Sequence, residues 1–322
     1  MPRNLSIFSF SGPLRSLVRI LLFVLFLEGF LNLGGWVFLF IQEYRNQAHA
    51  VSGSYRILCL GDSITANGGD YSYPSQLQYT LNHAGSEMKF QVINRGTPSW
   101  TTSEMSEHLG KYLQEYHPQM VIFMVGVNDV SFFTTVPVNE KSKIKFLILD
   151  RIKTYKLFKR LWKESRDSAT EPEEQVSGDD GFMVKPVEIV PITNPGVQVY
   201  KSLSHVVEVM PPKYYREIVR YHPLTIRNYN DMIELALNKG IKVVVMQYPM
   251  VSVTPLRDII YLKDHVLFVD NEMIFKEAVG RQGLRQYFED DYGHLTREGA
   301  ALLAGNLSQR IMDDIFRNHV SS

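Results

Sequence analysis

Two short motifs near opposite ends of the chain carry the residue types that an activated serine needs. Ser63 follows an apolar run, residues 57–60, that stops at a Gly-Asp pair, so its hydroxyl is expected on a tight bend between a strand and a helix. The stretch from Asp291 to His294 supplies a carboxylate and an imidazole three residues apart. A histidine can take the proton of a serine hydroxyl, and a carboxylate can orient that histidine. The chemistry indicated is the activation of a serine hydroxyl as a nucleophile.

Two further polar motifs lie between these, each directly after an apolar run. The tripeptide Asn-Arg-Gly ends at Gly96, and the tetrapeptide Gly-Val-Asn-Asp ends at Asp129. Taken singly, each motif is also compatible with an ordinary turn or helix cap, and His294 with the cap of a helix that begins near Thr296. Their joint occurrence favours a single site.

The four motifs occur in the order and context of the SGNH family of GDSL-type esterases and lipases, which this chain resembles. The residues that carry the resemblance are Ser63, Gly96, Asn128 and His294. It covers residues 56–130 and 241–310. Many relatives have a second glycine three residues after the position of Gly96, where this chain has Ser99.

The resemblance implies a Ser-His-Asp mechanism. His294 would take the proton of Ser63 and later return it to the leaving group. Asp291 would hold the imidazole in the useful tautomer and stabilise its charged form. The Asp-x-x-His spacing of the family selects Asp291 over the adjacent Asp290, which is then expected to be a solvated neighbour.

The resemblance also implies an oxyanion hole, which is a set of fixed donors for the negative oxygen of the intermediate. The implied donors are the backbone N–H groups of Ser63 and Gly96 and the side-chain amide of Asn128. Asp62 and Asp129 are expected to make supporting hydrogen bonds. Trp100 is a candidate wall of a substrate pocket, or else an ordinary core tryptophan.

The rest of the sequence alternates short apolar runs with helical segments, which predicts parallel strands covered on both faces. The expected strands are residues 56–60, 91–94, 120–125, 242–247 and 267–270. The expected helices are residues 74–83, 103–116 and 226–238. This pattern predicts a three-layer α/β/α fold with a mostly parallel sheet of about five strands and ligand groups at their carboxyl ends. The resemblance implies the flavodoxin-like arrangement of SGNH hydrolases.

The composition fits an enzyme of ordinary size. The 322 residues are 45% hydrophobic, with 34 basic and 34 acidic side chains, enough for one large core and an appendage. Zero net charge gives no reason to expect nucleic acid. Cys59 is the only cysteine, so no intrachain disulfide can form. The sequence has no zinc-like His or Cys cluster, P-loop or dinucleotide glycine pattern, so no metal or organic cofactor is expected.

Residues 20–41 form an apolar segment long enough, at ~1.5 Å per residue, to cross a hydrocarbon core of about 30 Å. Glu28 near its centre costs roughly 3 kcal/mol on insertion scales. Sixteen Leu, Ile, Val and Phe residues, at about −0.3 to −0.6 kcal/mol each, outweigh that cost. Three arginines precede the segment and only Arg45 closely follows it, which predicts a cytoplasmic N-terminus and a catalytic domain outside the cytoplasm.

A cleaved signal peptide is the alternative, because the tripeptide Ala-His-Ala ending at Ala50 has the small-x-small pattern. The apolar run is longer than the ~7 to 15 residues of a signal core, which favours an uncleaved single-pass anchor. We therefore expect residues 1–50 to form a cytoplasmic tail, anchor and linker. Residues 51–322 would form the catalytic domain, with an insertion or lid at about 132–220.

Residues 141–166 in this insertion contain ten basic residues, with apolar residues at near-helical spacing, as in a basic amphipathic helix. Such a helix could lie on an anionic membrane surface. The favoured interpretation is a lid helix whose apolar face packs on the core.

The working hypothesis is a membrane-anchored serine esterase that acts outside the cytoplasm on an O-acyl group, such as O-acetyl, of a carbohydrate or lipid. Two alternatives stay open. The same machinery could transfer the acyl group to an envelope polysaccharide, which would make the protein an O-acyltransferase. A protein that keeps the fold could also bind ligands without catalysis, although Ser63, Asp291 and His294 speak against this.

Overall fold

The structure is a computed structural model, and it describes residues 12–48, 52–129, 152–155, 157–158, 161–162 and 221–320. They fall into two units. The first unit draws on Met1–Tyr44 and Val136–Gly181, and the second draws on Arg45–Thr135 and Phe182–Ser322. Most of the predicted insertion at 132–220, including most of the basic helix, lies outside the described residues.

The second unit contains the predicted site residues and alternates strands with helices along the chain. The strands are β1 (Tyr55–Gly61), β2 (Phe90–Gly96), β3 (Met120–Met124), β4 (Lys242–Met246) and β5 (Val266–Val269). The longer helices are α3 (Tyr73–Asn82), α4 (Thr102–Tyr116), α8 (Pro223–Leu237), α10 (Glu272–Gln282) and α12 (Arg297–Val320). The short helical turns are α2 (Ser63–Ala66), η1 (Gly69–Tyr71), α9 (Thr254–Ile259), η3 (Lys263–His265) and α11 (Leu284–Tyr287).

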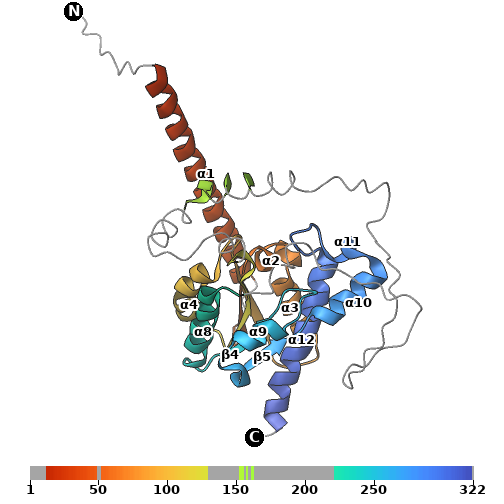
Figure 1. Cartoon of the computed structure of the whole chain (residues 1–322). Helices are drawn as coiled ribbons and strands as arrows, with labels where there is room; N and C mark the ends of the chain where they lie inside the picture. The colour runs from red at the N-terminus through yellow and green to blue at the C-terminus, as the bar shows by residue number, and fades with distance from the viewer. Residues whose placement is uncertain are drawn as a thin grey trace, which may run out of the picture. The chain divides into compact units, whose positions relative to one another are not determined.

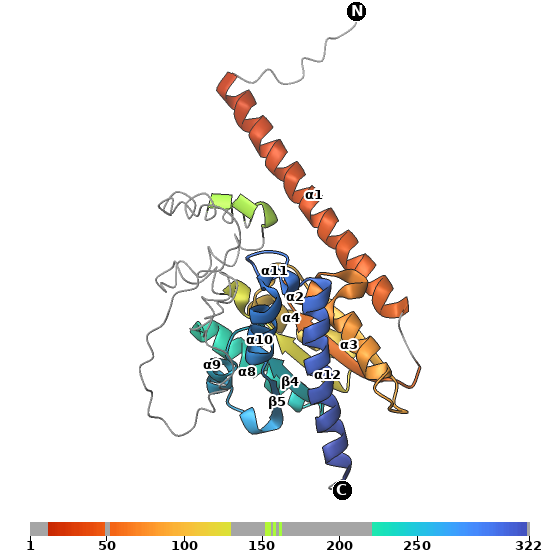
Figure 2. The same ribbon diagram turned by 90° about the vertical axis from the view of Figure 1, so that its right-hand side faces the viewer.

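The described strands form one parallel sheet of five strands in the order β2-β1-β3-β4-β5. This is the flavodoxin-like order of a doubly wound sheet. Helices α4 and α8 lie on one face, and α3, α10 and α12 lie on the other (Figures 1 and 2). The predicted three-layer α/β/α fold is confirmed.

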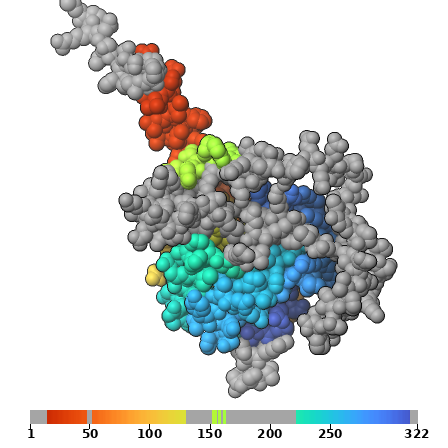
Figure 3. Space-filling view, viewed as in Figure 1, coloured from red at the N-terminus to blue at the C-terminus, as the bar shows by residue number. Residues whose placement is uncertain are grey.

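Two hydrophobic clusters, one on each face of the sheet, join these layers. Along β1, Ile57 and Cys59 belong to the cluster that includes α3 and α12, whereas Leu58 and Leu60 belong to the cluster that includes α4 and α8. All four side chains are fully buried. Both faces of the strand are therefore apolar, which explains its continuous apolar run. In the view of Figure 3, α8 is the teal surface beside the blue surface of the later residues.

The predicted helices differ from the observed ones by a few residues at their ends. Helix α8 begins at Pro223, three residues before the predicted start at 226. Proline is favoured in the first turn because its φ is preset and its missing N–H would have no partner there. The side chain of His222 accepts a hydrogen bond from the N–H of Leu224 at 3.2 Å and caps the helix.

Helix α1 (Gly12–Ala48) contains the predicted apolar segment. Residues Arg15–Gln47 are long and apolar enough to cross a membrane, a criterion of length and composition only. The large apolar side chains along it are exposed, for example Phe26 at 71%. The domain boundary near residue 50 and the membrane anchor itself stay predictions.

Two glycines let the turn after β1 approach its neighbours closely. In the parallel register, Gly61 lies opposite Gly96 of β2 and Met124 of β3. A Cβ at Gly96 would overlap the backbone nitrogen of Ala66 in α2, and a Cβ at Gly61 would overlap the hydroxyl of Thr65. The first turn after Ser63 therefore packs on β2 because residue 96 has no side chain.

We expect Gly96→Ala to lower the stability of the protein by about 1–3 kcal/mol, since overpacking against backbone forces the turn or the strand to move. Gly110→Ala in α4 is the matched control, because a Cβ there meets nothing within 4 Å. That variant should be neutral or up to about 1 kcal/mol more stable, because alanine favours helix over glycine. Thermal unfolding of both variants checks this, and equal melting temperatures for the two would contradict it.

Candidate active site

Ser63 stands at the carboxyl end of β1, as the first residue of α2. Asp62 caps this short helix, and its Oδ1 accepts a hydrogen bond from the N–H of Ile64 at 2.9 Å. Asp62 and Ile64 are buried, whereas Ser63 is half-buried. The turn thus places the serine at the edge of the sheet where the loops after parallel strands meet.

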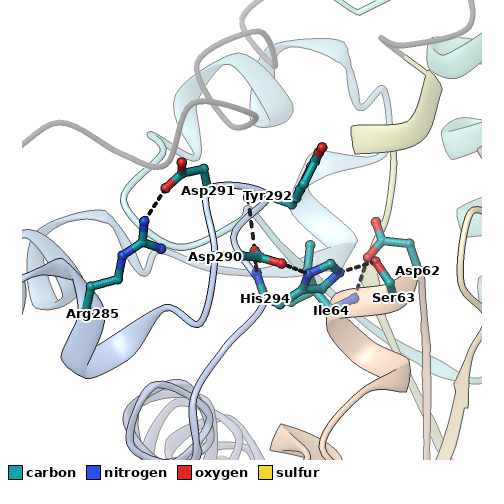
Figure 4. A network of polar contacts seen from close by, with 8 residues as sticks. All are labelled: Asp62, Ser63, Ile64, Arg285, Asp290, Asp291, Tyr292 and His294. Carbon is teal, nitrogen blue, oxygen red and sulfur yellow. Dashed lines mark hydrogen bonds and ion pairs between the residues drawn. The ribbon is translucent and has the colours of Figure 1, made fainter. Parts of the chain in front are cut away.

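His294 faces Ser63 across the site, as Figure 4 shows. Its Nε2 lies 2.9 Å from Ser63 Oγ, and its Nδ1 lies 2.6 Å from Asp290 Oδ2. The other oxygen of Asp290 accepts the backbone N–H groups of Tyr292 and His294 at 3.0 and 3.1 Å. A carboxylate on Nδ1 favours the tautomer with its proton there, which leaves the Nε2 lone pair facing the serine.

Asp291, the predicted partner of His294, lies elsewhere. Its Oδ1 accepts a hydrogen bond from Arg285 at 2.7 Å, and both side chains are exposed (Figure 4). The predicted pairing of Asp291 with His294 is therefore wrong, and Asp290 holds the imidazole instead. The cause is the turn that Asp290 closes, in which Gly293 has a φ of 89°. Because of this turn, the imidazole of His294 faces Asp290, four residues before it, and not Asp291, three residues before it.

Asn128 lies in the turn after β3 and is half-buried. Its Nδ2 donates a hydrogen bond to the carbonyl of Trp100 at 2.9 Å. An amide nitrogen carries two hydrogens, so this bond orients the group and leaves the second hydrogen for another acceptor. The Trp100 ring lies 4.6 Å from the His108 ring, centroid to centroid, and packs against the core. Its role as a pocket wall stays a prediction.

Asp129 ties the same turn to two helices. Its Oδ1 accepts the N–H of Thr102 at 2.9 Å, and its Oδ2 accepts the hydroxyls of Thr102 and Thr225, each at 2.6 Å. Thr102 is the first residue of α4, and Thr225 lies in the first turn of α8. The buried carboxylate of Asp129 thereby holds the turn that carries Asn128 in place.

Gly96 is the second predicted backbone donor of the oxyanion hole. Its N–H donates to Asn94 Oδ1 at 2.9 Å, so it is engaged within its own turn. The same Asn94 side chain donates from Nδ2 to the carbonyl of Thr65 at 2.9 Å. The donor role of Gly96 stays a prediction, and the structure gives a separate reason for glycine here, the close approach of α2.

Ser99 adopts a backbone conformation that favours glycine, with a φ of 63°. It lies in a turn in which the N–H of Trp100 donates to the carbonyl of Thr97 at 3.2 Å. Proline in the second place and a positive φ in the third are the features of a type II turn. Ser99 therefore occupies the third position of a type II turn, where glycine would adopt the positive φ with the least strain.

Tyr248 joins the turn of Ser63 to the turn of Asn128. Its hydroxyl donates to Asp62 Oδ2 and accepts the N–H of Val127 at 3.2 Å. The side chain follows β4 and is fully buried. One phenol therefore spans two adjacent loops, and burial raises its pKa, so the hydroxyl keeps the proton that it donates.

Burial and hydrogen bonding shift the pKa values of Asp62, Asp129 and Asp290 in different directions. Burial raises the pKa of Asp62 to about 6, although hydrogen bonds from Tyr248 and the N–H of Ile64 oppose this. Burial also raises the pKa of Asp129. At Asp290 partial burial acts in the same direction, but hydrogen bonds from His294 outweigh it and the pKa lies below its usual value. Asp290 is therefore ionised at neutral pH and can accept a hydrogen bond from the Nδ1 proton of His294.

Several of these contacts had no recognisable sequence signal. Tyr248 and Thr225 lie far from the motifs and look like ordinary residues of a strand exit and a helix start. The sequence shows Asp290 beside Asp291, but only the path of the backbone determines which of the two carboxylates faces His294. In the part of the chain that the structure describes, no group of three or more His, Cys, Asp and Glu side chains could hold a metal ion.

The fold, with a serine and a histidine in contact at the sheet edge, defines an ester hydrolase of the α/β/α class. The chain belongs to the GDSL-like lipase/acylhydrolase family, whose model matches residues 59–302. This match spans all four motifs.

Solved structures of low sequence identity are also similar. A catalytic mutant of Axe2, an acetylxylan esterase from Geobacillus stearothermophilus, is 15% identical, with a TM-score of 0.47 over 82% of this chain and 96% of that chain. A protein described as lipolytic and of the G-D-S-L family, from Desulfitobacterium hafniense DCB-2, is 13% identical, with a TM-score of 0.42 over 80% of this chain and 99% of that chain. No match was found among curated proteins.

The raised pKa of Asp62 predicts a pH-dependent term in stability. In the folded protein the pKa of Asp62 is about 6, against an ordinary value of 3.8, so protonation stabilises the folded state relative to the unfolded chain. That contribution is fully present below pH ~4 and is lost as the pH rises through ~6. At about 1.4 kcal/mol per pKa unit, its size is at most about 3 kcal/mol.

Asp62→Asn removes this titration. We expect the stability of the variant relative to the wild type to rise between pH 4 and 6 and to level off above pH ~7. Unfolding of both proteins at a series of pH values measures the difference. A difference that does not change with pH would show that Asp62 keeps an ordinary pKa in the folded state.

Proposed function

We propose that this chain is a membrane-anchored serine esterase that hydrolyses O-acyl esters, such as O-acetyl groups, of a carbohydrate or lipid outside the cytoplasm. The observation that carries the proposal is the chain of contacts from Ser63 through His294 to Asp290, with distances of 2.9 and 2.6 Å. These are the contacts that turn a serine hydroxyl into a nucleophile at neutral pH.

In the first half-reaction, Ser63 Oγ attacks the carbonyl carbon of the ester while His294 Nε2 takes its proton. The ionised Asp290 stabilises the imidazolium that results. The carbonyl oxygen becomes an oxyanion, which the free amide hydrogen of Asn128 and the N–H of Ser63 would bind. The first N–H groups of a helix have no partner within it, so the N–H of Ser63 is suited to this role.

The intermediate then breaks the bond to the alcohol oxygen, which takes the proton from His294 and leaves as the alcohol. In the second half-reaction a water molecule gives a proton to His294 and attacks the acyl-enzyme. Collapse of that intermediate releases the carboxylic acid and returns the proton to Ser63. An acceptor hydroxyl in place of the water would make the same site a transferase.

The membrane part of the proposal is supported by α1. Its apolar side chains are exposed along the helix, and such a surface is unfavourable in water. The arginines before the apolar segment and the single Arg45 shortly after it support an N-terminus in the cytoplasm. The catalytic domain would then meet substrates of the cell envelope.

The first test is hydrolysis of p-nitrophenyl acetate, butyrate and palmitate by the full-length protein in detergent, beside Ser63→Ala. We expect the variant to lose activity by at least about 10³-fold, because no other group supplies the nucleophile. A preference for acetate supports a deacetylase, and a preference for palmitate supports a lipase. Equal turnover by the folded wild type and the variant would contradict ester hydrolysis at Ser63.

The second test distinguishes the neighbouring carboxylates. Asp290→Asn should lower kcat on the order of 10²–10⁴-fold, because the imidazole loses its orientation and its counter-charge. Asp291→Asn is the matched control and should change kcat by less than about threefold, since its exposed pair with Arg285 contributes little. If Asp291→Asn has the larger effect, the orienting role belongs to Asp291 after all.

A further inference from the structure

Two asparagine side chains cover the outward backbone groups of β2, which is the outer strand of the sheet. Near its amino end, Asn82 accepts the N–H of Phe90 and donates to the carbonyl of the same residue, both at 2.9 Å. Near its carboxyl end, Asn46 accepts the N–H of Asn94 at 3.0 Å and donates to its carbonyl at 3.1 Å. Each side-chain amide thus takes the place of a residue in a neighbouring strand.

Asn46 lies in the last turn of α1 and belongs to the second unit, which begins at Arg45. Its side chain is 7% exposed, and its carbonyl accepts a hydrogen bond from Gln91 Nε2 at 3.3 Å. The neighbouring Arg45 pairs with Asp70 at 3.5 Å, but both side chains are exposed, and such pairs contribute little. The buried amide of Asn46 is therefore the contact of this turn whose loss costs most.

The side chain of Asn94 connects the same point of β2 to the serine turn. Its Nδ2 donates to the carbonyl of Thr65 at 2.9 Å, and its Oδ1 accepts the N–H of Gly96 at 2.9 Å. Thr65 belongs to α2, the short helix that begins with Ser63, and the last carbonyls of a helix have no partner within it. Asn94 thus holds the end of the helix that carries the nucleophile.

The two asparagine contacts on β2 differ in what lies beyond them. The side chain of Phe90 packs in the hydrophobic cluster on the α3 and α12 face of the sheet, whereas that of Asn94 reaches the serine turn. Loss of Asn82 would therefore loosen the sheet at its amino end. Loss of Asn46 would loosen the residue that holds α2.

A small movement of this turn is expensive for the chemistry. Ser63 Oγ lies 2.9 Å from His294 Nε2, and proton transfer needs a separation of this size. A displacement of about 1 Å can lower the rate on the order of 10²-fold.

We propose that Asn46 is a positioning residue for catalysis, which acts through Asn94 to hold the turn of Ser63 against His294. This inference rests on the serine esterase of the proposed function. The helix that contains the expected membrane anchor then also completes the catalytic domain. Cleavage after Ala50 would cut the chain between Asn46 and the strand that it holds.

The test compares Asn46→Ala with Asn82→Ala in the full-length protein in detergent. Each variant removes two hydrogen bonds to one residue of β2, so both melting temperatures should fall on the order of 5 °C. We expect kcat for p-nitrophenyl acetate to fall roughly 10- to 100-fold in Asn46→Ala, with KM changed less than about threefold. In Asn82→Ala, kcat should stay within about twofold of the wild type. Equal kcat values for the two variants would overturn the positioning role.

Labelling by a fluorophosphonate gives a second measurement, in which Ser63 Oγ bonds to phosphorus and fluoride leaves. Its rate should fall with kcat in Asn46→Ala and stay unchanged in Asn82→Ala. A wild type that is labelled at Ser63 but hydrolyses no ester would contradict the proposed hydrolysis, and the labelling rates would still test Asn46. If Asn46→Ala does not fold, Asn46→Ser and Asn82→Ser give the same comparison, because a serine hydroxyl can still donate and accept a hydrogen bond.

A double-mutant cycle with Asn94→Ala tests the route. This variant removes the side chain that connects β2 to Thr65 and Gly96, so it should lower kcat by itself. In its background, Asn46→Ala should lower kcat by less than about twofold further, while it still lowers the melting temperature. A further loss of kcat as large as in the wild-type background would show that Asn46 does not act through Asn94, and would overturn the inference.

Discussion

The position of β1 between β2 and β3 is the constraint on which the site depends. Parallel pairing on both sides places the carboxyl ends of three strands at one edge, with Gly61 opposite Gly96 and Met124. The loops that follow these strands therefore leave the sheet side by side. Residues from three distant parts of the sequence meet because the observed register aligns the ends of these strands.

Within that edge, buried carboxylates connect the loops at a cost in solvation. Asp62 accepts from the hydroxyl of Tyr248, and Asp129 accepts from the hydroxyls of Thr102 and Thr225, so the donors in these bonds are neutral. Hydroxyl donors satisfy a carboxylate without adding a charge that must also be buried. Because each acid bridges two elements, the turns of Ser63 and Asn128 are held relative to each other before substrate binds, as an oxyanion site requires.

The strands of the sheet could be predicted because buried parallel strands leave continuous apolar runs, whereas their flavodoxin-like order was implied by the family resemblance. Ser63, Asn128 and His294 were predicted from the motifs and the family resemblance. Ser63 and His294 are in contact, and Asn128 lies in the turn after β3 at the same edge of the sheet. Asp290 was missed because residue spacing cannot reveal a positive φ at Gly293 that changes which carboxylate faces the ring. Gly96 was predicted as an oxyanion donor, and the structure adds a steric reason for glycine at this position that the sequence alone does not reveal.

The last turn of α1 contacts β2, the outer strand of the sheet, through Asn46. Asn46 pairs with the backbone of Asn94, donating to its carbonyl at 3.1 Å and accepting its N–H at 3.0 Å. Because β2 is the outer strand of the sheet, these two groups would otherwise face no neighbouring strand. The side chain of Asn94 in turn holds Thr65 and Gly96 beside the serine turn. The boundary expected near residue 50 would separate Asn46 from the sheet, so a truncated enzyme keeps this connection only if it begins at or before Asn46.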